Sequence, residues 1–148
     1  MKLDLTIPDG WTAGGSGIWR TGDLVVTVSP LSAQPTVLTA TSAATAVKQH
    51  RALDREIAID RSGHFATTLG WPATWFIARL RGGGATTHHR FAVCYDMLEH
   101  FAIAAADATD LETLERRRSE IETTFASARP HWSGVGGISQ IFTGIDHV

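Results

Sequence analysis

The amino-acid sequence predicts an α+β fold, an antiparallel sheet of about six strands with helices packed on both faces. Short stretches in which apolar and polar residues alternate recur along the chain, which is the pattern of half-buried strands. The segments that join these stretches after Arg55 are too short for the crossovers that parallel strands need. Two stretches with apolar residues at helical spacing, 36–51 and 109–128, supply the helices.

The N-terminal part of the chain predicts three strands. Alternation over residues 3–7 indicates a half-buried strand, which Pro8-Asp9-Gly10 ends with turn-forming residues. Residues 17–20 and 23–29 predict two short strands around a turn at Thr21-Gly22. The glycine-rich stretch before them lacks the spacing of phosphate-binding loops, so we predict a plain turn there.

The middle of the chain predicts one helix and four strands. The helix over 36–51 has a narrow stripe of mainly small residues, which lets it lie close against a sheet. A strand at 55–61 follows, and Ser62-Gly63 is predicted to turn the chain. The further predicted strands are 73–81, 87–95 and 100–106, and the helical stripe comprises Val37, Ala40, Ala43, Ala44, Val47 and Arg51.

The last regular element is a predicted helix with clear signals at both ends. Thr109 and Glu112 form a capping box, which satisfies otherwise unpaired N–H groups at a helix start. Pro130 is predicted to end the helix. Its exposed side carries the ion pairs Glu112–Arg116 and Arg118–Glu122, and its apolar stripe comprises Leu111, Leu114, Ile121, Phe125 and Ala128.

Five chemically reactive side chains lie close together in the sequence, Cys94, Tyr95, Asp96, Glu99 and His100. The alternation on either side predicts a hairpin with a four-residue loop, with large side chains on one face and small ones, including Cys94, on the other. A nucleophile needs its base within hydrogen-bond reach, and this arrangement spreads the five residues over two faces and a loop. We therefore predict no catalytic residue here and a buried, unreactive Cys94.

The histidines are the other candidates for a chemical site. His88 and His89 are adjacent in a strand and point to opposite faces, so they do not readily share one metal ion. We predict that they are exposed histidines at a sheet edge, and that the chain binds no metal and no cofactor. The alternative is a small-molecule-binding or enzymatic pocket between sheet and helix that uses His64, His88 or His100.

Composition narrows the class of protein further. The formal net charge is -2, with 13 Lys and Arg against 15 Asp and Glu, and positive charge is not clustered enough for nucleic-acid binding. The chain shows no signal peptide and no membrane-length apolar run, and its single cysteine does not point to an oxidising compartment, so we predict a cytoplasmic protein. Trp11, Trp19, Trp71 and Trp75 are predicted to pack in the core and at strand ends.

Several features together resemble the PsbP/DcrB-like superfamily. These are an N-terminal strand that ends in Pro8, Gly10 and Trp11, the turn Gly70-Trp71-Pro72-Ala73 before an apolar strand, a late hairpin with small residues, and a closing helix near Phe125. The resemblance covers roughly residues 3–129. It implies an antiparallel sheet with helices on both faces. This superfamily includes photosystem subunits, lipoproteins, a yeast nuclear import factor that binds Ran, and Eag-type chaperones of type VI secretion.

The resemblance implies a non-enzymatic protein-binding or adaptor protein, with a chaperone-like role toward a secreted protein as one form of that function. We predict one domain over residues 1–129 and an apolar tail over 130–148 that docks on this domain, on a second copy or on a partner protein. The tail carries little charge and is too short to be stable alone. The residues predicted to bind the partner are Trp132, Ile138, Ile141, Phe142 and Ile145.

Overall fold

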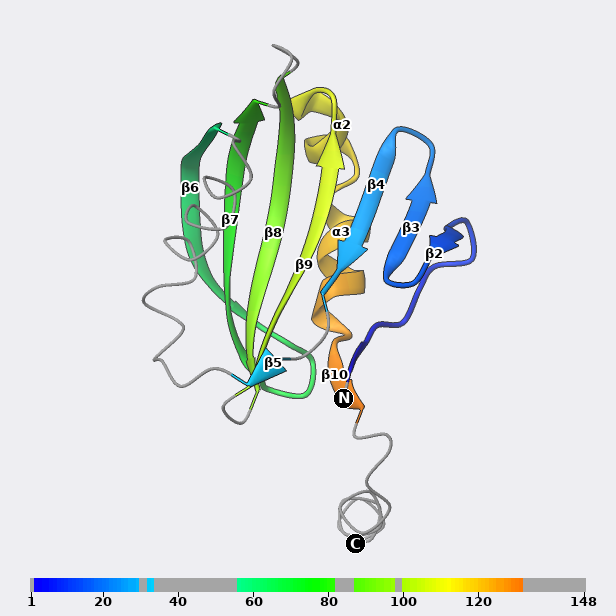
Figure 1. Cartoon of the computed structure of the whole chain (residues 1–148), viewed down its shortest axis with the longest axis vertical. Coiled ribbons are helices and arrows are strands. Elements are labelled where there is room, and N and C mark those ends of the chain that lie inside the picture. The colour runs from blue at the N-terminus through cyan, green and yellow to red at the C-terminus, as the bar shows by residue number, and fades with distance from the viewer. Residues whose placement is uncertain (1, 30–31, 34–55, 82–86, 98–99, 132–148) are drawn as a thin grey trace, which may run out of the picture.

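The computed structural model describes residues 2–29, 32–33, 56–81, 87–97 and 100–131. These residues form one long antiparallel sheet, a separate two-stranded sheet and two consecutive helices (Figure 1). The strands are β1 Lys2–Asp4, β2 Thr12–Gly15, β3 Ile18–Thr21, β4 Leu24–Val28, β5 Ser32–Ala33, β6 Glu56–Ala66, β7 Pro72–Arg81, β8 Thr87–Met97, β9 His100–Ala108 and β10 Arg129–His131.

Neighbouring strands of the long sheet follow the order β2-β3-β4-β9-β8-β7-β6, and β5 pairs with β9 outside this path. The α+β class and the antiparallel sheet are therefore confirmed. The strands predicted near 17–20, 23–29, 73–81, 87–95 and 100–106 are all present. β1 is shorter than the strand predicted for 3–7, and it pairs with β10 rather than with the long sheet.

The prediction that Ser62-Gly63 turns the chain is wrong. β6 continues through both residues to Ala66, and one extra residue near Asp60 makes a bulge against β7. Gly63 lies opposite Trp75, and a Cβ atom on Gly63 would lie 2.7 Å from the indole Nε1. Gly63 therefore makes room for a large side chain within a paired strand.

The β8–β9 hairpin is confirmed, but its loop and faces differ from the prediction. Met97 pairs with His100, so only two residues connect the strands. Ala102 then lies opposite Tyr95, and Ala104 lies opposite Val93. Large side chains of β8 thus share a face with alanines of β9, which leaves room for the helices above them.

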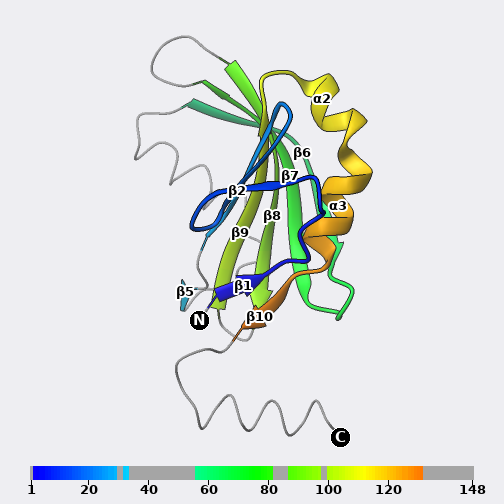
Figure 2. The same cartoon turned by 90° about the vertical axis from the view of Figure 1, so that its right-hand side faces the viewer.

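The two helices are α2 Leu111–Arg116 and α3 Arg118–Ala126. The side chain of Asp110 accepts the N–H of Thr113 at 2.7 Å, so Asp110 is the cap of α2 in place of the predicted Thr109. α3 ends before Ser127, and the predicted helix stop, Pro130, lies in β10. Both helices lie on the same face of the sheet (Figure 2).

Helices on both faces are not supported by the part of the chain that the structure describes. The helix predicted for 36–51 lies outside the described residues. The apolar stripe of the final helix is confirmed, because Leu114, Ile121, Phe125 and Ala128 are all buried. Of the two predicted ion pairs, Arg118–Glu122 is present, with 2.7 Å between Nε and Oε1.

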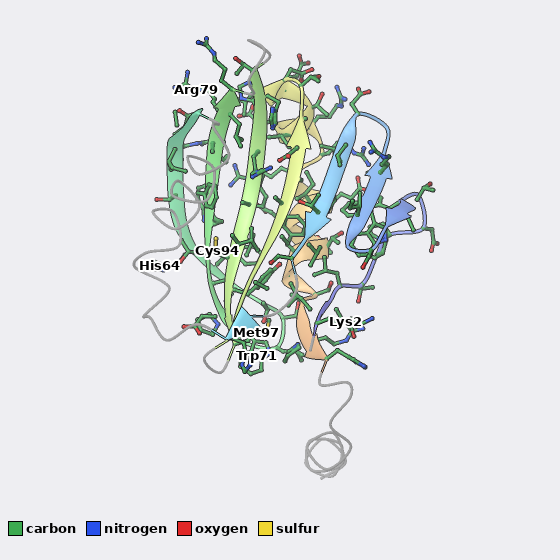
Figure 3. The ribbon with its side chains drawn as sticks, viewed as in Figure 1. Lys2, His64, Trp71, Arg79, Cys94 and Met97 are labelled. Atoms are coloured by element: carbon green, nitrogen blue, oxygen red, sulfur yellow. The ribbon has the colours of Figure 1, made fainter. Side chains whose placement is uncertain are left out.

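Both faces of the sheet are apolar. The larger core lies under the helices, where the hydroxyl of Tyr95 donates to the carbonyl of Phe125 at 2.7 Å. The opposite face has a second buried cluster of Phe76, Ala78, Leu80, Ala92, Cys94 and Ala105. Figure 3 shows Cys94 within the sheet, Trp71 and Met97 at one end and Arg79 at the other. The predicted burial of Cys94 is confirmed, since it is 2% exposed.

The predicted packing role of the tryptophans is also confirmed. Trp11 is buried in the larger core, and Trp19, Trp71 and Trp75 are partly buried and pack against it. Trp75 stacks on Phe91 with 6.2 Å between ring centroids.

Candidate binding groove

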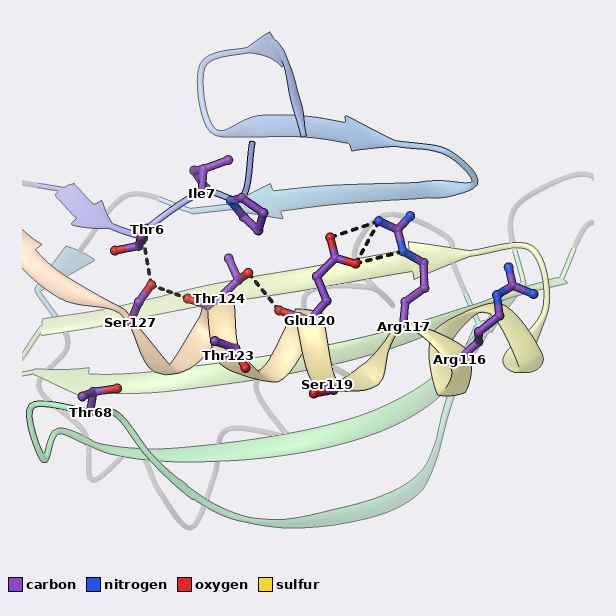
Figure 4. Close-up of a pocket in the computed structure, with 11 residues that line it drawn as sticks. Thr6, Ile7, Thr68, Arg116, Arg117, Ser119, Glu120, Thr123, Thr124 and Ser127 are labelled. Carbon is purple, nitrogen blue, oxygen red and sulfur yellow. Dashed lines mark hydrogen bonds and ion pairs between the residues drawn. The ribbon is translucent and has the colours of Figure 1, made fainter. Parts of the chain in front are cut away.

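A groove runs along α3 between this helix and the segment that follows β1 (Figure 4). We call it the α3 groove. Its cavity volume is about 730 Å³, which lies within the range of ligand-binding pockets. The lining residues are Thr6, Ile7, Pro8, Thr68, Arg116, Arg117, Ser119, Glu120, Thr123, Thr124 and Ser127.

Hydrogen bonds close the groove at the C-terminal end of α3. The hydroxyl of Ser127 accepts the backbone N–H of Thr6 at 2.8 Å and donates to the carbonyl of Thr124 at 2.5 Å. The backbone N–H of Thr68, in the β6–β7 turn, donates to the carbonyl of Ala126 at 2.8 Å. Three segments distant in the sequence therefore meet at this point and hold the groove open in one shape.

A network of charged groups fixes the other end. Arg117, which lies between the two helices, donates to the carbonyl of Thr21 at 2.6 Å and to its hydroxyl at 2.8 Å. The carboxylate of Glu120 accepts from Arg117 at 3.1 Å and from the indole N–H of Trp11 at 2.5 Å. Arg117 and Glu120 therefore neutralise each other and tie α3 to the β3–β4 turn.

The groove also presents side chains that this framework does not use. Arg116, Ser119 and Thr123 are exposed and follow one another along one flank of the helices. Among the described residues, the hydroxyls of Ser119 and Thr123 have no hydrogen-bond partner. A hydroxyl both donates and accepts, so this flank can pair with the N–H and C=O groups of a bound polypeptide.

The histidines named as candidates do not come together. His64 is exposed on β6, in the row that runs through Thr74 to Cys94. His88 lies on the same face but about 20 Å further along β8. His100 pairs with Met97 on the opposite face. A single pocket cannot use all three.

His88 and His89 point to opposite faces, as predicted, but they are not at an edge. β8 lies between β7 and β9, and both histidines are partly buried. His88 Nε2 is 3.8 Å from the carboxylate of Asp107, and His89 Nδ1 is buried with no hydrogen-bond partner. Within the described ranges, no three His, Cys, Asp or Glu side chains are arranged to hold a metal ion.

Among the residues that the structure describes, Tyr95 and Asp110 have clearly shifted pKa values, and neither lines the α3 groove. Burial raises the pKa of Tyr95 well above its usual value, and the neighbouring Cys94 adds to this shift. Hydrogen bonds from Thr113 lower the pKa of Asp110. Both shifts follow from structural contacts, burial in the core and capping of α2.

The partner-binding residues predicted from the sequence are not the residues that line the α3 groove. Trp132, Ile138, Ile141, Phe142 and Ile145 lie outside the described residues. The one available signal was the spacing of Ser119, Thr123 and Ser127, which puts hydroxyls on successive turns of one helix flank. The other wall of the groove comes from the opposite end of the chain, and no local pattern indicates it.

None of the described helices has the length and apolar character needed to cross a membrane. A scan against protein-family models found no match, and a search of curated proteins found none either.

The chain is similar in structure to the cyanobacterial PsbP protein CyanoP from Synechocystis sp. PCC 6803, with a TM-score of 0.61 and 17% sequence identity over 87% of this chain and 86% of that one. It is also similar to PA94, a protein of unknown function from Pseudomonas aeruginosa, with a TM-score of 0.55 and 10% identity over 90% of this chain and 100% of the other. The chain therefore has a PsbP-like fold.

Proposed function

We propose that this chain is a cytoplasmic adaptor that binds an extended segment of another protein in the α3 groove and has no catalytic activity of its own. A chaperone-like role toward a secreted protein is one form of this function. The observation that supports the proposal is the flank of Arg116, Ser119 and Thr123, which offers unpaired polar groups inside a groove with a fixed framework.

The dimensions of the groove suit a short stretch of polypeptide. α3 spans residues 118–126 and is about 13 Å long, which matches about four residues of an extended strand. Ile7 and Pro8 form an apolar wall opposite the hydroxyls. A bound segment can therefore direct its backbone toward the helix and an apolar side chain toward this wall.

The charges indicate which segment fits best. Glu120 is neutralised by Arg117, whereas Arg116 lines the groove as an exposed cation. We therefore expect a partner segment with an acidic side chain at the Arg116 end and small or hydroxyl side chains along Ser119 and Thr123.

The alternative function, small-molecule binding, has one observation in its favour. A hollow of about 280 Å³ lies on the sheet face away from the helices, beside Ser29, Phe76 and Arg90. However, Arg90 already makes two hydrogen bonds to Asp107, at 2.6 and 2.8 Å. The hollow is also smaller than the α3 groove, so protein binding is the function that the geometry supports better.

The test compares two exposed threonines. A photo-crosslinking amino acid is placed at Thr123 in the α3 groove or at Thr12 on β2, and the products formed in native extract are identified. The proposal requires a specific product from Thr123 and not from Thr12. The identified protein is then purified, and its affinity is measured by calorimetry.

Thr123→Trp is expected to weaken the binding of that purified partner at least about tenfold, since a large side chain fills the groove. Thr12→Trp is expected to leave the affinity unchanged. The melting temperatures of both variants serve as the folding control. If the Thr123→Trp variant and the unsubstituted protein bind the partner with equal affinity, the partner does not bind in the α3 groove.

A further inference from the structure

The strand β6 is a long edge of the sheet (Figure 1). It has eleven residues and pairs with β7, and no strand of the described part of the chain lies on its other side. The opposite edge, β2, has only four residues and a register shift near Gly15. An edge strand exposes N–H and C=O groups to which another strand can add, and lysine or proline commonly protects it. β6 contains neither residue type.

Residues 61–66 follow the bulge of β6 and form its regular part, because their register against β7 is unbroken. Ser62 and His64 are exposed on the face away from the helices, since they lie opposite Phe76 and Thr74. On the helix face, Arg61 is exposed and Phe65 is half-buried. This stretch therefore offers backbone groups for pairing and a row of side chains on each face.

Trp75 adds an aromatic side chain to this edge. Its indole crosses from β7 over Gly63, so closely that a Cβ atom on Gly63 would lie 2.7 Å from Nε1. Trp75 is half-buried, and its Nε1 has no hydrogen-bond partner among the residues that the structure describes. The guanidinium of Arg118 lies 5.3 Å from the ring centroid and holds the indole in this position.

We propose that two copies of this chain pair antiparallel through residues 61–65 of β6, with Gly63 opposite Gly63 of the second copy at a two-fold axis. Opposite side chains in such a pair lie on the same face, so the two sheets continue into one another with their helices on one side. Arg61 then lies opposite Phe65 of the second copy, and the guanidinium can stack on the aromatic ring.

The remaining facing pairs in this register are also complementary. Ser62 lies opposite His64 of the second copy, and its hydroxyl can pair with the imidazole. At the axis, the two Trp75 indoles meet above the two glycines, where opposite Cβ positions are about 4.5–5.5 Å apart. Arg61 can make its contact because its ion pair with Glu115 is loose, at 3.8 Å, and its side chain is 55% exposed.

Neighbouring registers lack this complementarity. An axis at Arg61 places two guanidinium groups opposite each other, and an axis at His64 does the same with two imidazoles and moves Arg61 past the end of β6. An axis at Ser62 places Arg61 opposite Gly63. The row therefore matches a second copy of itself in one register. The dimer presents two α3 grooves on one side of its sheet, but this inference does not rest on the proposed role of that groove.

The first test compares two variants that differ only in the sign of one introduced charge. Ser62→Glu with His64→Glu places like charges opposite each other in both halves of the dimer, whereas Ser62→Glu with His64→Lys places opposite charges there. Both positions are exposed, so the fold tolerates these changes, and melting temperatures check it. Sedimentation equilibrium is expected to give a dimer dissociation constant at least about tenfold higher for the first variant.

Equal dissociation constants for the two variants would overturn the proposal. A purified unsubstituted protein that stays monomeric at every concentration would also overturn it, and this is the result expected if β6 pairs with a different protein. All measurements use the full-length chain without a partner, so failure here is distinct from failure of binding at the α3 groove.

The second test reads the register in a Cys94→Ala background, so that only introduced thiols react. Chains with Ser62→Cys are mixed with chains with His64→Cys in an oxidising buffer. The mixture is expected to form an intermolecular disulfide at least about tenfold faster than either variant alone, because only positions 62 and 64 lie opposite each other. The control mixes His64→Cys with Thr12→Cys, on the other edge strand β2. An equal or faster disulfide in this control would overturn the pairing of β6 with itself.

Discussion

Gly63 and Trp75 face each other across β6 and β7 so closely that a Cβ atom on Gly63 would lie 2.7 Å from the indole Nε1. The other side of this contact is also occupied, because the guanidinium of Arg118 lies 5.3 Å from the centroid of the Trp75 ring. The indole is therefore held between a strand and a helix and has little freedom to move.

Gly63→Ala is expected to lower the free energy of unfolding by about 1–3 kcal/mol, because the added methyl group must displace Trp75. Gly10→Ala is the matched control, since a Cβ atom at Gly10 meets nothing within 4 Å. Urea denaturation of the two variants measures the difference. Equal stability of both variants would show that Trp75 adapts without cost.

Tyr95 is the single tyrosine of the chain, so its ionisation can be followed directly by ultraviolet absorbance. Its folded-state pKa is raised well above 10.0, chiefly by burial. Its contribution to stability is therefore complete below pH 10.0 and is lost as the pH rises through the folded-state pKa. Tyrosinate absorbance is expected to appear together with unfolding, and titration of the native protein near pH 10 would contradict this.

Tyr95→Phe removes the hydrogen bond to the Phe125 carbonyl and is expected to cost about 1 kcal/mol at neutral pH. The same variant is expected to lose less stability than the unsubstituted protein above pH 10, because it has no buried phenol to ionise. Denaturant titrations at pH 7 and at alkaline pH measure both effects.

Asp110→Ala is expected to lower the melting temperature at neutral pH, since Asp110 caps α2. Thr109→Ala is the control, because the capping box predicted from the sequence would give Thr109 that role. The pKa of Asp110 is lowered from 3.8, so its contribution is present above pH 3.8 and is lost as the pH falls through the folded-state pKa. The difference between Asp110→Ala and the unsubstituted protein should therefore shrink in acid.

Asp107→Ala is expected to cost about 2 kcal/mol, because it leaves the partly buried guanidinium of Arg90 without its two carboxylate bonds. Glu115→Ala, in the exposed pair Arg61–Glu115 with 3.8 Å between the charged atoms, is expected to cost almost nothing. Urea denaturation compares the two variants, and similar losses would mean that burial does not set the strength of these pairs.

Cys94 is expected to resist a thiol reagent in the native state and to react rapidly in denaturant, because its side chain is 2% exposed. Labelling followed by mass spectrometry measures both rates. Fast labelling without unfolding would show that the sheet face around Cys94 is open to solvent.

The alternation of apolar residues was enough to predict most strands, because a period of two follows from strand geometry alone. It was not enough to assign the faces of the β8–β9 hairpin, since one shift in register exchanges the partners of every side chain. The role of Gly63 depends on Trp75 in the next strand, so a local turn signal was misleading there.

The α3 groove could not be predicted from the sequence, because it too depends on contacts between distant segments. Its two walls come from Thr6 and Ser127, near opposite ends of the described chain, and they meet only through tertiary hydrogen bonds. Likewise, Arg117 lies at the break between α2 and α3, and its side chain contacts Thr21, which is 96 residues away in the sequence. Patterns within one segment cannot report such contacts.

The antiparallel pairing of Lys2 with His131 and of Asp4 with Arg129 has a mechanical consequence. Force applied at Lys2 and His131 pulls directly across the two-stranded sheet, so its hydrogen bonds break one after another, as in unzipping, rather than all together in shear. The next contact to carry the load is the bond from Thr6 to Ser127. Because residues 6–8 follow β1 along the chain and line the α3 groove, a weak pull at this one place would open that groove.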